Sequence, residues 1–220
     1  MPPVFLNRNP KADFDQVGTS PHGWIALHQA RTSRQIVLVR DHPDATISDV
    51  GLVAKVAHVN IARILGVYFE KHSVYVVHEF LDLDLFEVFP LASEVEVASV
   101  MSQIISAIIY LASFPIILRV DTIRISFHGV VKLGIDMNYK PTTGSLTREA
   151  DRAFLTAYAG ETMMRLGGVT SWTQEAMDFL SILQSGSLPA LAHPFLLKSK
   201  GSLALREPVK FAIQKLIAAG

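Results

Sequence analysis

The stretch HVNIARILGVYFEKHSVYVVHEFLDLDLFEVF, residues 58–89, is the most informative part of this chain. It contains two runs rich in β-branched and aromatic residues, Ile64–Phe69 and Val74–Phe80, which are typical of buried strands. The polar residues from Glu70 to Ser73 separate the two runs. The pattern therefore predicts a β-hairpin in the first half of the chain.

On the N-terminal side of this hairpin, the sequence predicts one more buried strand and one short helix. QIVLVR, Gln35–Arg40, is a continuous apolar run bounded by polar residues, as expected of a strand. Ser48 precedes Asp49–Ala57, in which valines recur at helical spacing, so Ser48 is a candidate N-cap. Residues 1–13 are rich in Pro and Asn and are expected to be extended.

On the C-terminal side, residues 97–118 form an uncharged run of 22 residues, long enough to span a bilayer. Serines interrupt the run and Pro115 lies near its end, while its apolar residues recur at the three- and four-residue spacing of a helix. We therefore interpret residues 94–113 as a buried core helix. The other elements expected after it are strands at about 116–118, 122–126 and 130–133, a turn at His128-Gly129, and helices at 151–166, 173–184 and 208–219.

The composition excludes several classes of function. The chain has 220 residues, half of them hydrophobic, and 20 basic residues balance 20 acidic ones, which argues against intrinsic disorder and against a strongly electrostatic nucleic-acid binder. With no Cys it has no disulfide, thiolate nucleophile or Cys-zinc site, and its eight His show no metal-binding spacing. The N-terminus lacks the apolar core of a signal peptide, so we expect an intracellular protein, cytoplasmic or nuclear.

Residues 58–89 resemble the part of eukaryotic protein kinases that reads HPNIxxLxG, a hairpin, and then YLVxEFLxxDL through the hinge between two lobes. VGTSPHG (17–23) resembles the glycine-rich loop, VLVR (37–40) the V-A-I-K strand, and HGVVKL (128–133) the strand before the D-F-G motif.

The resemblance implies an α+β, two-lobed protein-kinase-like fold. We expect a shortened kinase-like domain over residues 1–197, with a small antiparallel, five-stranded lobe at about 14–81 and a reduced, mainly helical lobe at about 82–197. Residues 198–220 form a C-terminal helical extension, whose apolar stripe is expected to pack on the large lobe or to contact a partner. The stripe consists of Leu205, Val209, Ile213, Leu216 and Ile217.

The nucleotide-binding motifs of the family are degraded here. Gly18 and Gly23 match the first and third glycines of the loop, but Ser20 replaces the middle one and the next residue is a proline without an N–H. Leu38 occupies the position of the small Ala beneath adenine, and Arg40 that of the phosphate-binding Lys.

Two further positions belong to the same lobe. Asp49 matches the helix C glutamate that pairs with the motif lysine, and His78 matches the residue that faces the adenine pocket. We expect the His78 ring to find an internal hydrogen bond, because burying it unpaired is costly. Leu38, Val77, His78 and Ile135 are expected to pack the former nucleotide cleft.

The catalytic motifs are also lost. Leu118, Arg119 and Val120 stand in place of H-R-D, and a valine can neither accept a proton nor bind a metal. Thr122 falls near the position of the magnesium-binding Asn, and Asp121 reaches the aspartate position only if the register shifts by one residue.

Ile135 replaces the D-F-G aspartate and is followed by Asp136, a lone carboxylate that makes a weak Mg²⁺ site. Only 14 residues separate Asp136 from Asp151, too few for an activation loop.

These losses predict a catalytically inactive pseudokinase that acts as a protein–protein interaction scaffold or allosteric adaptor. We expect no cofactor, no metal and no ATP, and no nucleic-acid or membrane partner; the partner is expected to be a protein, or a second copy of the chain. The alternatives are a nucleotide-binding switch without phosphotransfer and an atypical Mg²⁺-dependent phosphotransferase that uses Asp121 and Asp136.

Overall fold

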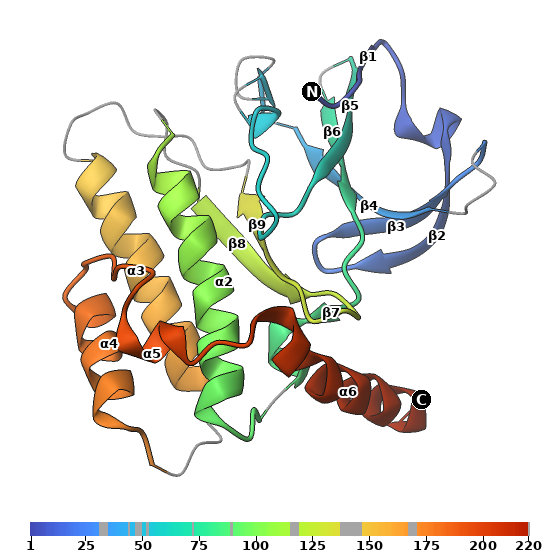
Figure 1. The fold of residues 1–220 in the computed structure, drawn as a ribbon. Coiled ribbons are helices and arrows are strands. Elements are labelled where there is room, and N and C mark those ends of the chain that lie inside the picture. The colour runs from blue at the N-terminus through green and yellow to red at the C-terminus, as the bar shows by residue number, and fades with distance from the viewer. Residues whose placement is uncertain are drawn as a thin grey trace. The chain divides into compact units, whose positions relative to one another are not determined.

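The computed structural model describes most of the 220 residues. The residues outside the description are 31–34, 44, 47–49, 52, 72, 89, 115–118, 137–146, 167–170 and 220, together with the side chains of 119, 136 and 147–151. Mixed α and β structure is present, as expected (Figure 1). The described strands are β1 (Val4–Leu6), β2 (Phe14–Ser20), β3 (Gly23–His28), β4 (Ile36–His42), β5 (Ile64–Glu70), β6 (Ser73–Glu79), β7 (Leu83–Asp84), β8 (Arg119–Ile125) and β9 (Val131–Asp136). The described helices are α2 (Glu94–Ala112), α3 (Thr147–Leu166), α4 (Gln174–Gln184), α5 (Pro194–Leu197) and α6 (Arg206–Ala219), with 3₁₀ helices η1 (Pro10–Ala12), η2 (Leu85–Val88) and η3 (Gly201–Leu205).

The chain divides into two compact units, with the boundary between Phe80 and Leu81. The first, which we call the sheet unit, contains β1 to β6. The second, the helical unit, contains β7 to β9 and α2 to α6.

The sheet unit is built on six strands in the order β1-β5-β6-β4-β3-β2. Five of them are antiparallel to their neighbours, and β1 adds to β5 in parallel, with Val4 opposite Val67. The five strands expected at about residues 14–81 are present as β2 to β6, and β1 is a sixth strand outside that range. β1 was missed because it has three residues, but the ring of Phe5 stacks on Tyr68 at 4.5 Å and holds the strand in place.

One face of this sheet carries the hydrophobic core of the unit. Successive side chains of a strand point to opposite faces, and one face of the central strands is uniformly apolar. The buried members of this cluster are Phe14, Ala26, Val37, Val39, Tyr68 and Val77, and Trp24 and Leu65 pack against it.

The short helix expected at residues 49–57 is described in part. Val50, Gly51 and Val53 are helical, and Val50 and Val53 are buried. Asp49, the residue that matches the helix C glutamate, lies outside the described residues.

In the helical unit, α2 is the central helix, and Figure 1 shows it beside α3. Ser93 begins it with a reciprocal cap, in which its Oγ accepts from the Glu96 N–H and the Glu96 carboxylate accepts from the Ser93 N–H. Among the described helices α2 alone is long and apolar enough to cross a membrane, a test that a buried core helix also passes. In α2, 61% of the 18-residue stretch that passes this test is buried inside the protein.

Polar side chains on α2 fasten other parts of the unit to it. Gln103 donates to the Gly129 carbonyl at 3.3 Å and accepts from the Val131 N–H at 2.9 Å, which fixes the β8–β9 hairpin. Ser99 Oγ accepts from the Lys200 N–H at 3.0 Å, and Ser102 Oγ lies 2.8 Å from Ser199 Oγ. The segment that leads to α6 is thereby held on α2.

The strand expected at 116–118 lies outside the described residues, and the strand expected at 122–126 begins three residues earlier than predicted. Residues 115–118 lie outside the description, and β8 runs without interruption over Arg119–Ile125, paired with β9 except for a bulge between Val120 and Thr122. The turn expected at His128-Gly129 is present, and Gly129 has a φ of 77°.

The apolar stripe on α6 is used only along its first half. Leu205 and Val209 are fully buried where α6 contacts η2 and η3, and Ile213 is half-buried. Leu216 and Ile217 are exposed. The expectation that the whole stripe packs on the large lobe was therefore wrong for its last turn.

Candidate functional site

The candidate phosphate-binding loop is a two-residue hairpin turn. Ser20 pairs with Gly23, so that Pro21 and His22 alone form the turn between β2 and β3. Ser20 Oγ accepts from the His22 N–H and donates to the Gly23 carbonyl, both at 3.2 Å. Because Pro21 has no N–H and that of His22 is already bonded, the turn offers few donors to a phosphate.

The two glycines of this motif have different roles. Gly23 has a φ of 147°, and a Cβ there would lie 2.3 Å from the Val39 carbonyl oxygen in the neighbouring strand. A Cβ at Gly18 would make only ordinary contacts with Ile25, at 3.7 Å or more. Gly23 is thus required by the close approach of β4, without any need for a ligand.

Leu38 and His78 lie opposite each other on β4 and β6 and share a face of the sheet with Arg40. Val77 belongs to the apolar cluster on the other face, with Val37 and Val39. The expectation that Val77 packs with Leu38 and His78 was therefore wrong, because neighbouring residues of one strand point to opposite faces.

His78 is only 4% exposed, and its Nε2 finds no hydrogen-bond partner in the described part of the chain. The expected internal hydrogen bond at this nitrogen was wrong. Burial lowers the pKa of His78 to about 3, and electrostatic interactions with Arg40 and His42 lower it further. The ring is therefore neutral at physiological pH.

The positions that the resemblance would assign to a catalytic loop lie in a β-ladder. Val120 pairs with Ile135 and both are buried, and Thr122 pairs with Gly134. A Cβ at Gly134 would lie 2.1 Å from Thr122 Oγ1, so Gly134 makes room for the threonine. The catalytic loop expected before residue 122 is wrong for residues 119–121, which belong to β8.

Arg119 pairs with Asp136 through the backbone, but the side chains of both lie outside the description, as does Leu118 entirely. The structure therefore does not describe the Asp136 carboxylate, the candidate metal ligand. Nor does it describe Leu118, which stands at the position of the H-R-D histidine.

Asp121 occupies the bulge in β8 and contributes to an acidic environment around Tyr158 on α3. Burial is the main factor that raises the pKa of Tyr158 to about 12, and the carboxylates of Asp121, Asp84 and Glu161 raise it further. The setting of Tyr158 could not be predicted from the sequence, because β8, β7 and α3, which supply the three carboxylates, are far apart along the chain. Tyr158 and Glu161, three residues apart on one helix, were the only local signal.

The arrangement offers little to a nucleotide or a metal ion. Within the described ranges, no group of three or more His, Asp or Glu side chains could hold a metal ion. The candidate nucleotide-binding residues, from Gly18 to His78, belong to the sheet unit. The candidate catalytic residues, from Val120 to Ile135, belong to the helical unit.

Comparisons with known proteins leave the family open. No protein-family model matches the chain, and no curated protein matches it.

Proposed function

We propose that this chain is a catalytically inactive, shortened protein-kinase-like domain that serves as a protein–protein interaction scaffold or adaptor and does not bind ATP. The observation that supports this most directly is the β8–β9 ladder. At the position of the catalytic aspartate it carries Val120, buried and paired with Ile135. Such a side chain has no acid–base or metal chemistry.

The β2–β3 turn supports the same proposal. A nucleotide triphosphate needs several N–H donors and a cation, and this turn has one proline and one N–H that is already bonded to Ser20. Leu38, half-buried opposite His78, adds bulk at the position that the resemblance assigns to the adenine base.

The experiment is thermal unfolding with and without millimolar ATP, ADP and Mg²⁺, on the wild type and on Leu38→Ala. A ligand that binds only the folded state raises the midpoint, by about 2.7 kcal/mol of stabilisation at a hundred times its Kd. We expect no shift in either protein. A shift in Leu38→Ala alone would mean that one side chain blocks a working pocket.

A Mg²⁺-dependent shift in the wild type would contradict the proposal and favour a nucleotide-binding switch. Turnover of ATP that Asp136→Ala abolishes would favour the phosphotransferase instead. For the scaffold role, a purified protein partner should bind the wild type and Asp136→Ala with the same Kd, whether or not ATP is present.

A further inference from the structure

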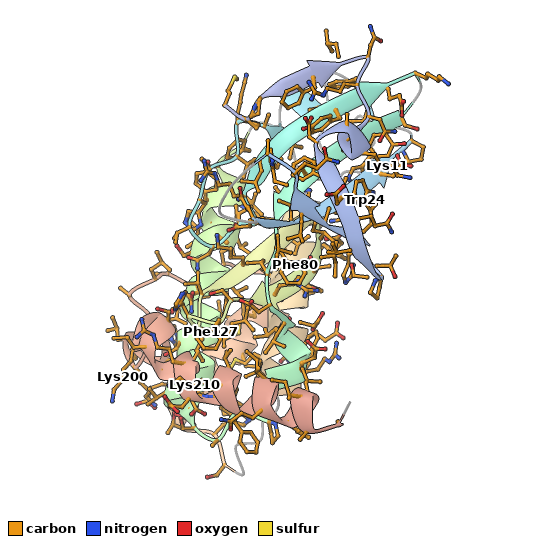
Figure 2. The ribbon with its side chains drawn as sticks, turned by 90° about the vertical axis from the view of Figure 1, so that its right-hand side faces the viewer. Lys11, Trp24, Phe80, Phe127, Lys200 and Lys210 are labelled. Carbon is orange, nitrogen blue, oxygen red and sulfur yellow. The ribbon has the colours of Figure 1, made fainter. Side chains whose placement is uncertain are left out.

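The surface that runs from the segment before α6 along this helix combines exposed apolar side chains with basic ones. Leu203 is 65% exposed and Ile217 75%, and Figure 2 shows Phe127, Lys200 and Lys210 gathered around the first turns of this helix. We call this region the α6 surface. Its members are Phe127, Lys200, Leu203, Arg206, Lys210 and Ile217, all of them exposed.

Two features bring these residues together. The tip of the β8–β9 hairpin lies against η3. Gly129 at this tip is so close to Ser202 that a Cβ on Gly129 would lie 2.2 Å from the Ser202 carbonyl oxygen. On α6, Arg206, Lys210 and Ile217 are spaced by four and seven residues, so they lie along one face of the helix.

The charge of this region differs from that of the chain as a whole. Residues 197–219 contain five basic side chains and one carboxylate, Glu207, in a chain with a formal net charge of zero. Lys198 is engaged by Glu94 and Glu175 in the helical unit, and Glu207 pairs with Lys210 at 2.7 Å. Asp82 accepts from the Phe127 N–H at 2.6 Å. The α6 surface contains three basic side chains, Lys200, Arg206 and Lys210, and two carboxylates, Glu207 and Asp82, lie beside it.

We propose that the α6 surface docks on an anionic phospholipid bilayer. Basic side chains interleaved with projecting Leu, Ile and Phe match an interface where negative headgroups lie above acyl chains. A nucleic acid fits less well, because Leu203 and Ile217 cannot stack on bases. A second copy meeting the same patch by two-fold symmetry would bring like charges together.

This proposal is independent of the proposed function. It departs from the expectation of no membrane partner, which considered only spanning or targeting segments, since peripheral binding needs neither.

The test is co-sedimentation of the full chain with vesicles of phosphatidylcholine alone, and with vesicles containing about a third phosphatidylserine. The variants are Leu203→Glu and Lys200→Gln. Val59→Glu is the matched control, because Val59 in the sheet unit is 65% exposed, as Leu203 is. All four proteins are first compared by circular dichroism, and these exposed substitutions should leave the fold unchanged.

We expect the wild type and Val59→Glu to bind only the phosphatidylserine vesicles and to be released by high salt. Lys200→Gln should bind about fivefold more weakly, the factor for one basic residue at such a surface. Leu203→Glu should bind at least about tenfold more weakly, because it loses an apolar contact and adds a negative charge.

Three results would overturn the proposal. The first is no binding to phosphatidylserine vesicles, and the second is equal binding to phosphatidylcholine alone. The third is a concentration-dependent dimer in sedimentation velocity that Leu203→Glu abolishes, which would identify a second copy as the occupant.

Discussion

Helix α2 in the helical unit and strand β6 in the sheet unit differ in how their polar side chains are bonded. Along α2 in the helical unit, Ser99, Ser102 and Gln103 are all hydrogen bonded, and each bond fastens another segment of the unit. In the sheet unit, His78 is as deeply buried as a core residue, yet its Nε2 has no partner among the described residues. Bonded polar groups contribute about 1 kcal/mol each, and a buried unpaired one costs about 1–3 kcal/mol. The three side chains of α2 therefore have a structural role, whereas we expect the unpaired nitrogen of His78 to lower stability.

The chain allows each unit to be followed separately, because it has two tryptophans and each unit contains one. Trp24 packs against the core of the sheet unit, and Trp172 lies 6.5 Å from the ring of Phe195 in the helical unit. In a Trp172→Phe background, fluorescence reports unfolding of the sheet unit. In a Trp24→Phe background, it reports the helical unit.

The largest expected effect comes from Gly129→Ala. Its φ of 77° disfavours any side chain, and the new Cβ would lie 2.2 Å from the Ser202 oxygen. We expect a loss of about 3 kcal/mol in the free energy of unfolding of the helical unit, measured by denaturant titration of Trp172 fluorescence.

Gly160→Ala in α3 is the control for this change. A Cβ at Gly160 makes ordinary contacts at 3.5 Å or more, and alanine favours a helix, so stability should rise by about 0.5 kcal/mol. Equal losses in the two variants would show that the close approach at Gly129 is unimportant.

Next is Gln103→Leu, which removes the partner of the Val131 N–H and of the Gly129 carbonyl. We expect the helical unit to lose about 2 kcal/mol, because two backbone groups lose their bonds at a site with little access to water. Gln184→Leu is the matched change at an exposed position of α4, and should alter stability by less than about 0.5 kcal/mol. If Gln103→Leu proves neutral, the contrast between the bonded side chains of α2 and the unpaired nitrogen of His78 is lost.

The same kind of substitution in the sheet unit should have the opposite sign. His78→Leu removes the unpaired ring nitrogen and keeps an apolar side chain opposite Leu38. We expect the sheet unit to gain about 1 kcal/mol at pH 7.5, measured by Trp24 fluorescence. A loss of stability instead would indicate that His78 makes a bond that matters.

The pH dependence sharpens this contrast. The pKa of His78 is lowered to about 3 from the usual 6.5, so the folded sheet unit favours the neutral ring. The cost of burying His78 is therefore smallest above pH 6.5, where the ring is neutral in both states, and it grows as the pH falls from 6.5 towards 3. We expect the stability of the sheet unit to fall over this range in the wild type and to fall less steeply in His78→Leu.

The smallest effect is expected for Glu94→Gln. Burial opposes ionisation of Glu94, but hydrogen bonds from Thr173 and Lys198 outweigh it and lower the pKa of this carboxyl. The substitution should cost the helical unit about 0.5 kcal/mol at pH 7, as expected for a partly exposed charged pair. Because the folded pKa is depressed, the difference between wild type and variant should vanish as the pH falls below 4.5. A difference that persists at low pH would rule out the ion pair as its cause.

Much of the fold could be predicted from local patterns. The strands at β4, β5 and β6 and the helices α2, α4 and α6 have strong periodicity and clear end signals, such as Ser93 and Glu96 at the start of α2. β1 could not be predicted, because three residues give no period and its stability comes from Tyr68, over 60 positions away.

The candidate site was predicted less well, and the reason is physical. A resemblance assigns roles by position, so residues 119–121 were expected to form a loop, whereas pairing with β9 makes them part of a strand. The isolation of His78 Nε2 was also missed. Hydrogen-bond partners depend on tertiary packing, which one sequence does not reveal.

The pairing of β1 with β5 has a consequence for synthesis of the chain. β1 leaves the ribosome before its partner β5, whose Val67, opposite Val4, follows more than 60 residues later. Until then Phe5 has no ring to stack on, and the strand can pair with any exposed sheet edge on a neighbouring nascent chain. Slow translation over residues 7–63 should therefore favour aggregation, and deletion of residues 1–6 should reduce this aggregation while weakening the finished sheet.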